Sequence, residues 1–332
     1  MFDKDVCLSS REFRMTQKVM ASPVKKNGMR GFFREMRVNK ALYIMLTPAV
    51  AFIVIFNYVP LYGLQVAFRN FNFIDGISGS PFVGLKNFNF YFKSMFFKQT
   101  TFNTLYLNTL FIAANVFMQV TTAVLLNEVT RRQQKAFQTA MFFPYFISWV
   151  VISQFVTALL SEKFGMVNNI IRSFGGEGVS WFTEPKYWPA FLTISSVWKN
   201  LGYGSVIYLA KIVGIDAELY EAARIDGASR FQEVTRVTLP LLVPTIVLLL
   251  LIAIGGVFRG DFQMIYSLIT DQKKMLIGVT EVIDTYVYRA MRVNSQYGMA
   301  AAIGLYQSVM GFILVMFSNF LVTRYDPDIA LF

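Results

Sequence analysis

The feature that most constrains this chain is a set of six apolar segments, each long enough to cross a membrane as a helix. The hydrocarbon core of a bilayer requires about 20 apolar residues per helix, because it tolerates only backbone whose hydrogen bonds close within the segment. The segments are approximately 41–59, 102–126, 136–160, 187–213, 240–258 and 297–322. We therefore expect an all-α membrane protein with about six transmembrane helices.

Composition supports this class and excludes most catalytic chemistry. Of the 332 residues, 55% are hydrophobic and only 15% are charged, whereas a soluble domain has about 25% charged residues. The chain has no histidine and a single cysteine, Cys7, which excludes an internal disulfide, a thiolate zinc cluster and an imidazole-based triad. It also contains no Walker-type phosphate-binding run. We expect no catalytic residues, no metal site, no cofactor bound by this chain and no enzyme activity of its own.

The basic residues are concentrated at the N-terminus. The net charge is +11, and ten of the 31 Lys and Arg precede residue 41. Such a tail before the first apolar segment holds an N-terminus in the cytoplasm. With that orientation, 18 Lys and Arg lie inside and 12 outside, and Lys199 lies in a span. We expect residues 1–40 to be a basic cytoplasmic tail and both termini to be cytoplasmic.

Two other roles are open to the tail. A phosphate-binding arm is less favoured, because no folded basic surface follows it, and we expect no nucleic-acid partner. Part of the tail could lie along anionic lipid, or the tail could be disordered. On the outer side, segment 61–101 is too polar to span the membrane and too aromatic to be a free linker. We expect it to pack on the membrane surface, where its aromatic residues are belt residues or, alternatively, a sugar-stacking platform.

A polar loop at about 214–239 interrupts the apolar segments. Asp216 can cap a helix that has Glu218 and Glu221 near its positive end. Gly227 is suited to end that helix at a positive φ, and Ser229 with Gln232 three residues later forms a capping box. The pattern predicts a short helix, a glycine hinge and a second helix exposed to the cytoplasm. Its small side chains favour a docking surface for another protein, and the alternative is an amphipathic helix that binds nothing.

The full pattern of this loop resembles a known family. ELYEAARIDGASRFQEVTRVTLPLLVP, residues 218–244, resembles the EAA loop of binding-protein-dependent ABC importer permeases in its glutamate, paired alanines, Asp-Gly-Ala and Leu-Pro. The resemblance implies a type I importer permease (MetI-like) fold over residues 41–332, in which this loop is a coupling helix that docks into an ATPase. The motif positions are Glu221, Ala222, Ala223, Asp226 and Gly227.

Further segments narrow the resemblance to a branch. FNYVPLYGLQVAFRNF (56–71), GSPFVGLKNF (79–88), LLNEV (125–129), FPYFISWVV (143–151) and DTYVYR (284–289) are similar to LplB-type sugar permeases, a branch that includes importers of aldouronates and alginate. The resemblance implies a saccharide substrate, a second permease, two ABC ATPases that bind ATP and Mg, and an extracytoplasmic solute-binding protein. It also implies a multi-pass protein of the bacterial cytoplasmic (inner) membrane.

Polar residues inside the predicted spans are candidates for the substrate path, because such residues are costly in lipid and usually face a cavity or another helix. The candidates are Asn108, Asn115, Gln119, Gln154, Trp198, Lys199, Asn200 and Tyr203. For each amide, hydrogen bonding between helices is the alternative. The Lys199 ammonium could contact an acidic saccharide, reach the interface, or pair with a carboxylate of a partner.

Two other functional classes make different demands on the sequence. A stand-alone secondary transporter or channel would be expected to have paired broken helices or repeat symmetry, neither of which is clear. A membrane-embedded enzyme would need clustered carboxylates or metal ligands. Asp261, Asp271, Glu281 and Asp284 share a predicted loop, but their spacing fits no ligand pattern. The sequence therefore favours the importer permease.

Overall fold

The computed structural model describes residues 39–269, 275–327 and 330. The basic tail, apart from residues 39 and 40, and Asp271 lie outside the described residues. The chain divides into two compact units, one ending at Tyr62 and the other beginning at Gly63. The described residues are helical apart from loops and turns and one antiparallel bridge between Arg69 and Phe82. The expected all-α class is confirmed.

The described part of the first unit contains one helical segment. Helix α3 (Lys40–Ile53) continues through a π-helical turn (Val54–Tyr58) and a 3₁₀ segment (Val59–Phe68) that crosses into the second unit. Large apolar side chains along it are exposed, among them Met45, Phe52 and Phe56. A helix with apolar side chains exposed all around suits lipid or the apolar surface of another protein.

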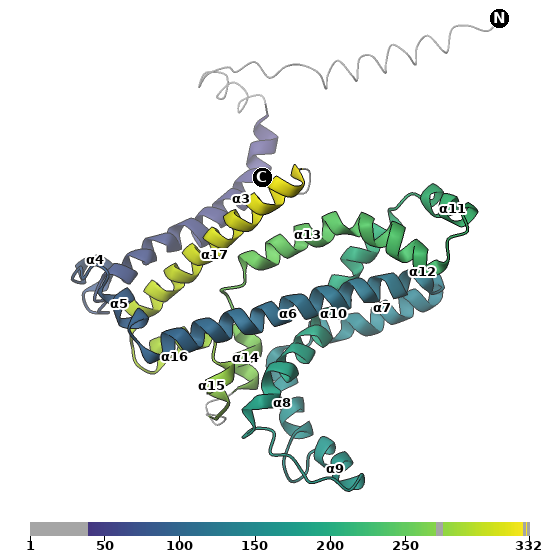
Figure 1. The fold of residues 1–332 in the computed structure, drawn as a ribbon. Helices are drawn as coiled ribbons and strands as arrows, with labels where there is room; N and C mark the ends of the chain where they lie inside the picture. The colour runs from purple at the N-terminus through teal and green to yellow at the C-terminus, as the bar shows by residue number, and fades with distance from the viewer. Residues whose placement is uncertain (1–38, 270–274, 328–329, 331–332) are drawn as a thin grey trace, which may run out of the picture. The chain divides into compact units, whose positions relative to one another are not determined.

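The second unit is built on long helices. The longest is α6 (Met95–Glu128), and α10 (Trp188–Val213) lies along both α6 and α7 (Arg131–Phe146). Helix α13 (Leu239–Gly255) lies along α17 (Tyr297–Tyr325) (Figure 1). The shorter elements are α4 (Gly76–Gly79), α5 (Lys86–Phe92), α8 (Trp149–Leu159), α9 (Met166–Ser173), the 3₁₀ turn Pro185–Tyr187, α11 (Ala217–Ile225), α12 (Arg230–Glu233), the π turn Val234–Thr238, α14 (Phe262–Leu268), α15 (Ile277–Thr280) and α16 (Ile283–Arg292).

Four helical stretches of the described chain have the length and apolar composition to cross a membrane. They are Lys40–Phe68, Met95–Glu128, Arg230–Gly255 and Tyr297–Arg324. Each coincides with one of the six predicted segments. Helix α10 occupies a fifth, with 26 residues, but Lys199 and Asn200 near its centre make it more polar. The remaining predicted segment is bent.

This bent segment, expected as a single span over 136–160, consists of α7 and α8 joined at an angle of 95°. Ile147 between them has extended backbone, so the first helix ends there. The Ser148 hydroxyl then accepts a hydrogen bond from the backbone N–H of Val151, 3.4 Å away, and caps α8. If the pair is counted as one span, the described residues contain five.

Side chains of α6 fasten the segment that connects α13 to α17. The Asn108 amide donates to the backbone oxygens of Val257 and Arg259 at 2.8 and 3.2 Å. One and a half turns earlier, the Asn103 amide donates to Gly278 and Glu281 oxygens, both at 3.1 Å. These bonds satisfy carbonyls that the broken helices leave without partners. The α14–α16 region is therefore held against the N-terminal half of α6.

Glycine sets the closest approach of α10 to α7. A Cβ atom placed on Gly202 would lie 2.3 Å from the backbone oxygen of Met141, which is too close for any side chain. Because the obstacle is helix backbone, the two helices would have to separate to admit even a methyl group.

We therefore expect Gly202→Ala to destabilise the subunit by about 1–3 kcal/mol, the usual range for overpacking. Gly214→Ala is the matched control, because a Cβ there would meet only ordinary contacts at 3.5 Å. Thermal unfolding of the purified subunit in detergent measures the difference. Equal melting temperatures for the two variants would contradict the close contact between α7 and α10.

Candidate coupling and translocation sites

The loop at 214–239 forms the two helices that the sequence predicts. Asp216 is the N-cap residue of α11 and has extended backbone, although its side chain makes no capping bond to the helix. Helix α12 passes through the π turn directly into α13, so that residues 230–255 form one continuous helical stretch. A displacement of the loop would therefore be transmitted directly to a long apolar helix.

Gly227 forms the corner between α11 and α12. Its φ is +79°, the left-handed conformation that glycine adopts without strain. The Gly227 N–H donates to the Arg224 oxygen at 3.0 Å and the Ala228 N–H to the Ala223 oxygen at 2.9 Å. This pair of bonds is a Schellman motif. The Ser229–Gln232 capping box follows immediately, as predicted.

An ion-pair cluster closes this corner, and the sequence interpretation missed it. Arg224 Nε lies 2.9 Å from Glu233 Oε1, and Arg230 Nη1 lies 3.4 Å from Glu233 Oε2. The Glu233 side chain is only 6% exposed. The hydrogen bond with Glu233 raises the pKa of the Arg224 guanidinium above its ordinary value. The available signal was a pair of opposite charges on the two sides of the predicted turn.

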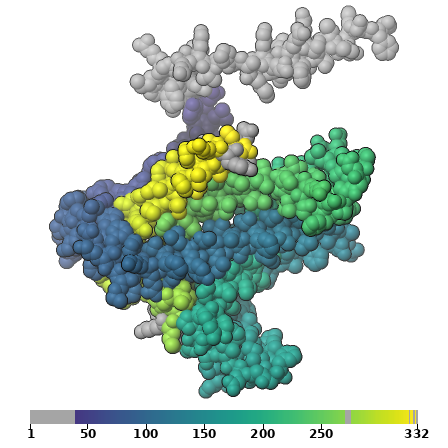
Figure 2. All heavy atoms as spheres, viewed as in Figure 1, coloured from purple at the N-terminus to yellow at the C-terminus, as the bar shows by residue number. Residues whose placement is uncertain are grey.

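Residues 214–239, called the coupling loop after the role that the sequence predicts, have an exposed surface of mixed character. Glu221, Ala222, Asp226 and Gly227 are exposed, and Ala223 is half-buried. Beside them the apolar side chains of Ile225 and Phe231 are 86% and 75% exposed. In Figure 2 the loop (green) projects from one end of the second unit. Two large apolar side chains are therefore exposed on a loop that is otherwise mostly polar.

Four of the predicted path residues line one cleft. This cleft, of about 300 Å³, lies between α6, α10 and α13 and is lined in part by Asn115, Gln119, Asn200 and Tyr203. The Gln119 amide donates to Asn115 Oδ1 and to the Asn200 backbone oxygen, both at 3.3 Å. Gly204 leaves room for it, because a Cβ there would lie 2.0 Å from the Gln119 side chain. The tertiary structure thus brings together amides from two helices that are about 80 residues apart in the chain.

The other predicted path residues lie elsewhere. Asn108 is buried and bonded to backbone, as described above. Gln154 and Trp198 are exposed and do not line this cleft. Gln154 and Trp198 therefore lie on surfaces that the described chain leaves uncovered.

Lys199 lies at the bend between α7 and α8. Its ammonium donates to the backbone oxygens of Pro144 and Tyr145, at 3.3 and 3.1 Å, and to that of Ile147. It also lies 5.2 Å from the centre of the Trp149 ring, which is a cation–π distance. The carbonyls at the C-terminal end of a helix carry partial negative charge and have no partner within the helix. Lys199 supplies both a hydrogen-bond donor and a positive charge.

Comparison with known families matches residues 119–329 to the binding-protein-dependent transport system inner membrane component. The matched residues include the coupling loop, α10, α13 and α17. This chain belongs to that family. It is an inner membrane permease.

Individual relatives confirm the branch. The polygalacturonan/rhamnogalacturonan transport permease YteP of Bacillus subtilis strain 168 is 34% identical over 87% of this chain and 89% of its own length. Protein LplB of the same organism is 31% identical over 87% and 91%. The first of these is a permease of a transport system, and permeases of this family do not themselves catalyse a reaction. Within the described residues, no group of three His, Cys, Asp or Glu side chains could hold a metal ion.

Solved structures confirm the permease fold. A chain of a bacterial ABC transporter that imports the acidic polysaccharide alginate is 34% identical, with a TM-score of 0.81 over 89% of this permease and 99% of that chain. A chain of a bacterial alginate ABC transporter in complex with a periplasmic protein bound to alginate pentasaccharide gives a TM-score of 0.80 at the same identity, over 88% and 97%. The MetI-like fold expected from the sequence is thereby shown.

The contacts of Lys199 lead to a prediction about the stability and transport rate of this permease. In Lys199→Met the three carbonyl partners lose their donor and the bend loses its positive charge, so we expect a less stable subunit and slower transport. If the ammonium acts on the bend, uptake of uronate and of neutral oligosaccharides should fall by the same factor. Parallel uptake assays in proteoliposomes test this, and a loss confined to uronate would show that the charge contacts substrate.

Proposed function

We propose that this chain is one permease of an ATP-driven importer of oligo- or polysaccharides, including acidic ones such as alginate. It forms the translocation path as a heterodimer with a second, homologous permease. Two cytoplasmic ATPases bind ATP and Mg, and an extracytoplasmic solute-binding protein delivers the saccharide. The family match, the polygalacturonan permease at 34% identity and the alginate transporter structures support this assignment.

The observation that carries the coupling role is the closed corner of the coupling loop. A loop that transmits a stroke must not deform, because deformation would absorb the displacement. Here the Schellman motif, the capping box and the Arg224–Glu233 pair all close the turn around Gly227. In addition, the Tyr220 hydroxyl lies 2.9 Å from the Thr238 hydroxyl and ties α11 to the base of α13. Closure of the ATPases would move the loop as one body and α13 with it.

In this scheme Glu221, Ala222, Ala223, Asp226 and Gly227 form the surface that enters the ATPase groove. The alanines let the ATPase backbone approach closely, and Ile225 and Phe231 supply apolar area at the edge. The loop lies in the cytoplasm, and both chain termini lie on the same side. The basic tail orients the chain by the positive-inside rule.

For the path, the cleft between α6, α10 and α13 provides groups that suit sugar hydroxyls. Gln119 offers its side-chain oxygen, and Asn200 offers its side-chain oxygen and one N–H, because these groups have no partner among the described residues. The Tyr203 ring stacks on Tyr145, with centroids 5.0 Å apart and planes 8° apart, and offers an aromatic surface at the cleft. Gln154 and Trp198 are exposed on other faces, where the second permease would complete the path. Lys199 and Asn108 maintain the backbone around it.

Coupling is tested by crosslinking in the assembled importer. With Cys7 replaced by Ser, a single cysteine at Ala222 should crosslink to an ATPase subunit, and one at Ser173 in α9 should not. Glu221→Lys should abolish saccharide-stimulated ATP hydrolysis while the subunit still inserts, because the motif glutamate then carries the opposite charge. Glu218→Lys, which makes the same charge change outside the motif, is the matched control. An active assembly that yields no crosslink from Ala222 would refute this role.

The path is tested by Gln119→Leu, which preserves side-chain bulk and removes the amide. We expect saccharide uptake to fall by about two- to twelvefold, the effect of losing one hydrogen bond worth ~0.5–1.5 kcal/mol. Thr121→Val, an exposed polar change on the same helix, should leave uptake unchanged. Uptake by proteoliposomes at a fixed concentration of loaded solute-binding protein is the measurement, and equal rates for the two variants would remove Gln119 from the path.

A further inference from the structure

A second depression lies at the other end of α6 from the coupling loop. It has a volume of about 580 Å³ and is lined by Phe96, Gln99, Ile277, Gly278, Glu281, Arg289 and Val293. Its walls come from α6, α15, α16 and the residues that join them. None of its residues takes part in the coupling loop or in the cleft described above. We call it the outer depression.

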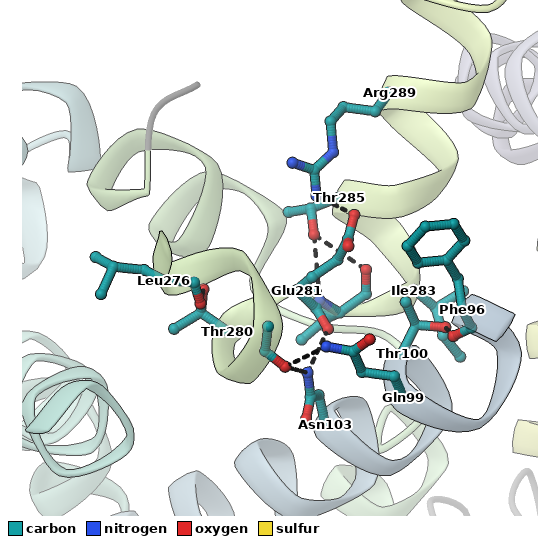
Figure 3. A network of polar contacts seen from close by, with 12 residues as sticks. Phe96, Gln99, Thr100, Asn103, Leu276, Thr280, Glu281, Ile283, Thr285 and Arg289 are labelled. Atoms are coloured by element: carbon teal, nitrogen blue, oxygen red, sulfur yellow. Dashed lines mark hydrogen bonds and ion pairs between the residues drawn. The ribbon is translucent and has the colours of Figure 1, made fainter. Parts of the chain in front are cut away.

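A charged pair forms one wall of the outer depression. Glu281 and Arg289 make an ion pair in which the carboxylate side chain is 5% exposed and the guanidinium side chain 27% exposed. Figure 3 shows the two side chains pointing toward each other, with Phe96 and Gln99 on the neighbouring helix. Burial raises the pKa of the Glu281 carboxyl, and Arg289 opposes that rise. Such pairs contribute little net stability, because desolvation offsets the attraction. A role beyond folding accounts better for a charged pair at this position.

The pair and its neighbours keep unused hydrogen-bonding capacity. A guanidinium has five N–H donors, and the described structure gives Arg289 one partner, Glu281. Gln99 donates its amide to the Gly278 oxygen, which leaves its side-chain carbonyl as an acceptor. The Phe96 ring is 49% exposed and is packed against Tyr286, with ring centroids 5.6 Å apart. The depression therefore combines an aromatic ring, a guanidinium and an amide acceptor.

This combination fits one chemical class best. An apolar ligand such as a lipid tail would leave the guanidinium donors without partners, which is unfavourable once water is excluded. A pyranose unit places its C–H face on an aromatic ring and its hydroxyls on polar side chains. A carboxylate on that unit would take the N–H donors of Arg289 in the paired geometry that guanidinium favours. The fit is to a uronate unit of a saccharide chain.

The position of the depression follows from α6 itself. Gln99 and Asn115 are both on this helix, 16 residues apart, which corresponds to about 24 Å along its axis. Farther along, Glu128 ends the helix near the coupling loop, close enough for its charge to act on Arg224. The outer depression, the cleft and the coupling loop therefore follow one another along α6. If the loop is cytoplasmic, the depression is on the entry side.

We propose that the outer depression is an entry-side subsite that holds one uronate unit of an acidic oligosaccharide while other units of the same chain reach the cleft. The inference rests on the proposed function, because it takes the coupling loop as cytoplasmic and the cleft as part of the path. The subsite would also select saccharides by the length of their chain. A hexasaccharide can engage both positions, whereas a disaccharide is too short to do so.

The test uses the reconstituted importer with its solute-binding protein and two probes, a uronate hexasaccharide and the matching disaccharide. Phe96→Ala with Gln99→Ala removes the ring and the amide. Arg289→Lys keeps the positive charge beside Glu281 and removes the fork of donors, so neither variant leaves a buried unpaired carboxylate. We expect each variant to raise the KM for hexasaccharide uptake about tenfold, which corresponds to the loss of one hydrogen bond to a charged group or of a contact of similar strength. Disaccharide uptake should be unchanged.

Two matched controls separate a local contact from general effects. Phe102→Ala removes an exposed ring from α6 outside the depression, and Arg292→Gln removes an exposed cation from the last turn of α16. Both should leave the KM of each probe unchanged. A charge effect spread over this surface would raise the KM in Arg292→Gln and leave it unchanged in Arg289→Lys, which would overturn the subsite.

The remaining outcomes are also decisive. Equal loss for hexasaccharide and disaccharide would overturn the proposal, because a length-selective contact cannot act on both. Loss of ATP hydrolysis stimulated by the solute-binding protein, with saccharide length making no difference, would identify the depression as a protein contact instead. Failure of the unaltered complex to hydrolyse ATP in response to any loaded solute-binding protein would overturn the proposed function itself.

Discussion

The structure depends on one constraint of the bilayer, namely that backbone groups without a helical partner must find one inside the protein. The described chain breaks its helices at several places near the apolar segments, and after α7 and α13 a side chain from another helix supplies a missing donor. Lys199 does so for the end of α7, and Asn108 does so after α13. Gln307 of α17 adds a bond of 2.7 Å to the Phe258 oxygen. Polar residues that are costly in lipid are thus used to allow breaks that a straight bundle would lack.

Under the same constraint, polar side chains make different kinds of hydrogen bond in three regions of the molecule. Asn103 and Asn108 donate their side-chain amides to backbone oxygens, and these bonds hold the connection between α13 and α17 against α6. Around the cleft, the amide N–H groups of Gln119 and Asn115 donate to Asn115 Oδ1, to the Ser196 hydroxyl and to backbone oxygens, and the Gln119 side-chain oxygen has no partner among the described residues. The coupling loop follows a third pattern, since its ion pairs and caps lie within the loop and close its corner. Helix α6 extends along all three regions.

Local features were predictable from the sequence, and distant contacts were not. The Gly227 corner, the Ser229–Gln232 box and most helix positions follow from residues three to five apart, whose contacts any helical turn must form. The Arg224–Glu233 pair was missed, because it exists only once both helices of the loop have folded back on each other. For Lys199 the sequence left substrate, the interface and a partner carboxylate open. The structure adds three backbone acceptors more than 50 residues away, at a bend that the apolar pattern did not predict.

By itself the sequence determined the class of protein, its helical segments and the shape of its coupling loop, since apolar length and capping residues act over a few turns of one helix. The tertiary structure alone decided which polar side chains serve the backbone and which face a cleft. The sequence does not distinguish among the eight polar side chains that are candidates for the path, and only four of them line the same cleft. The reason is physical. The direction of a polar group is decided by which helix packs beside it, and that packing joins residues about 50 to 180 positions apart.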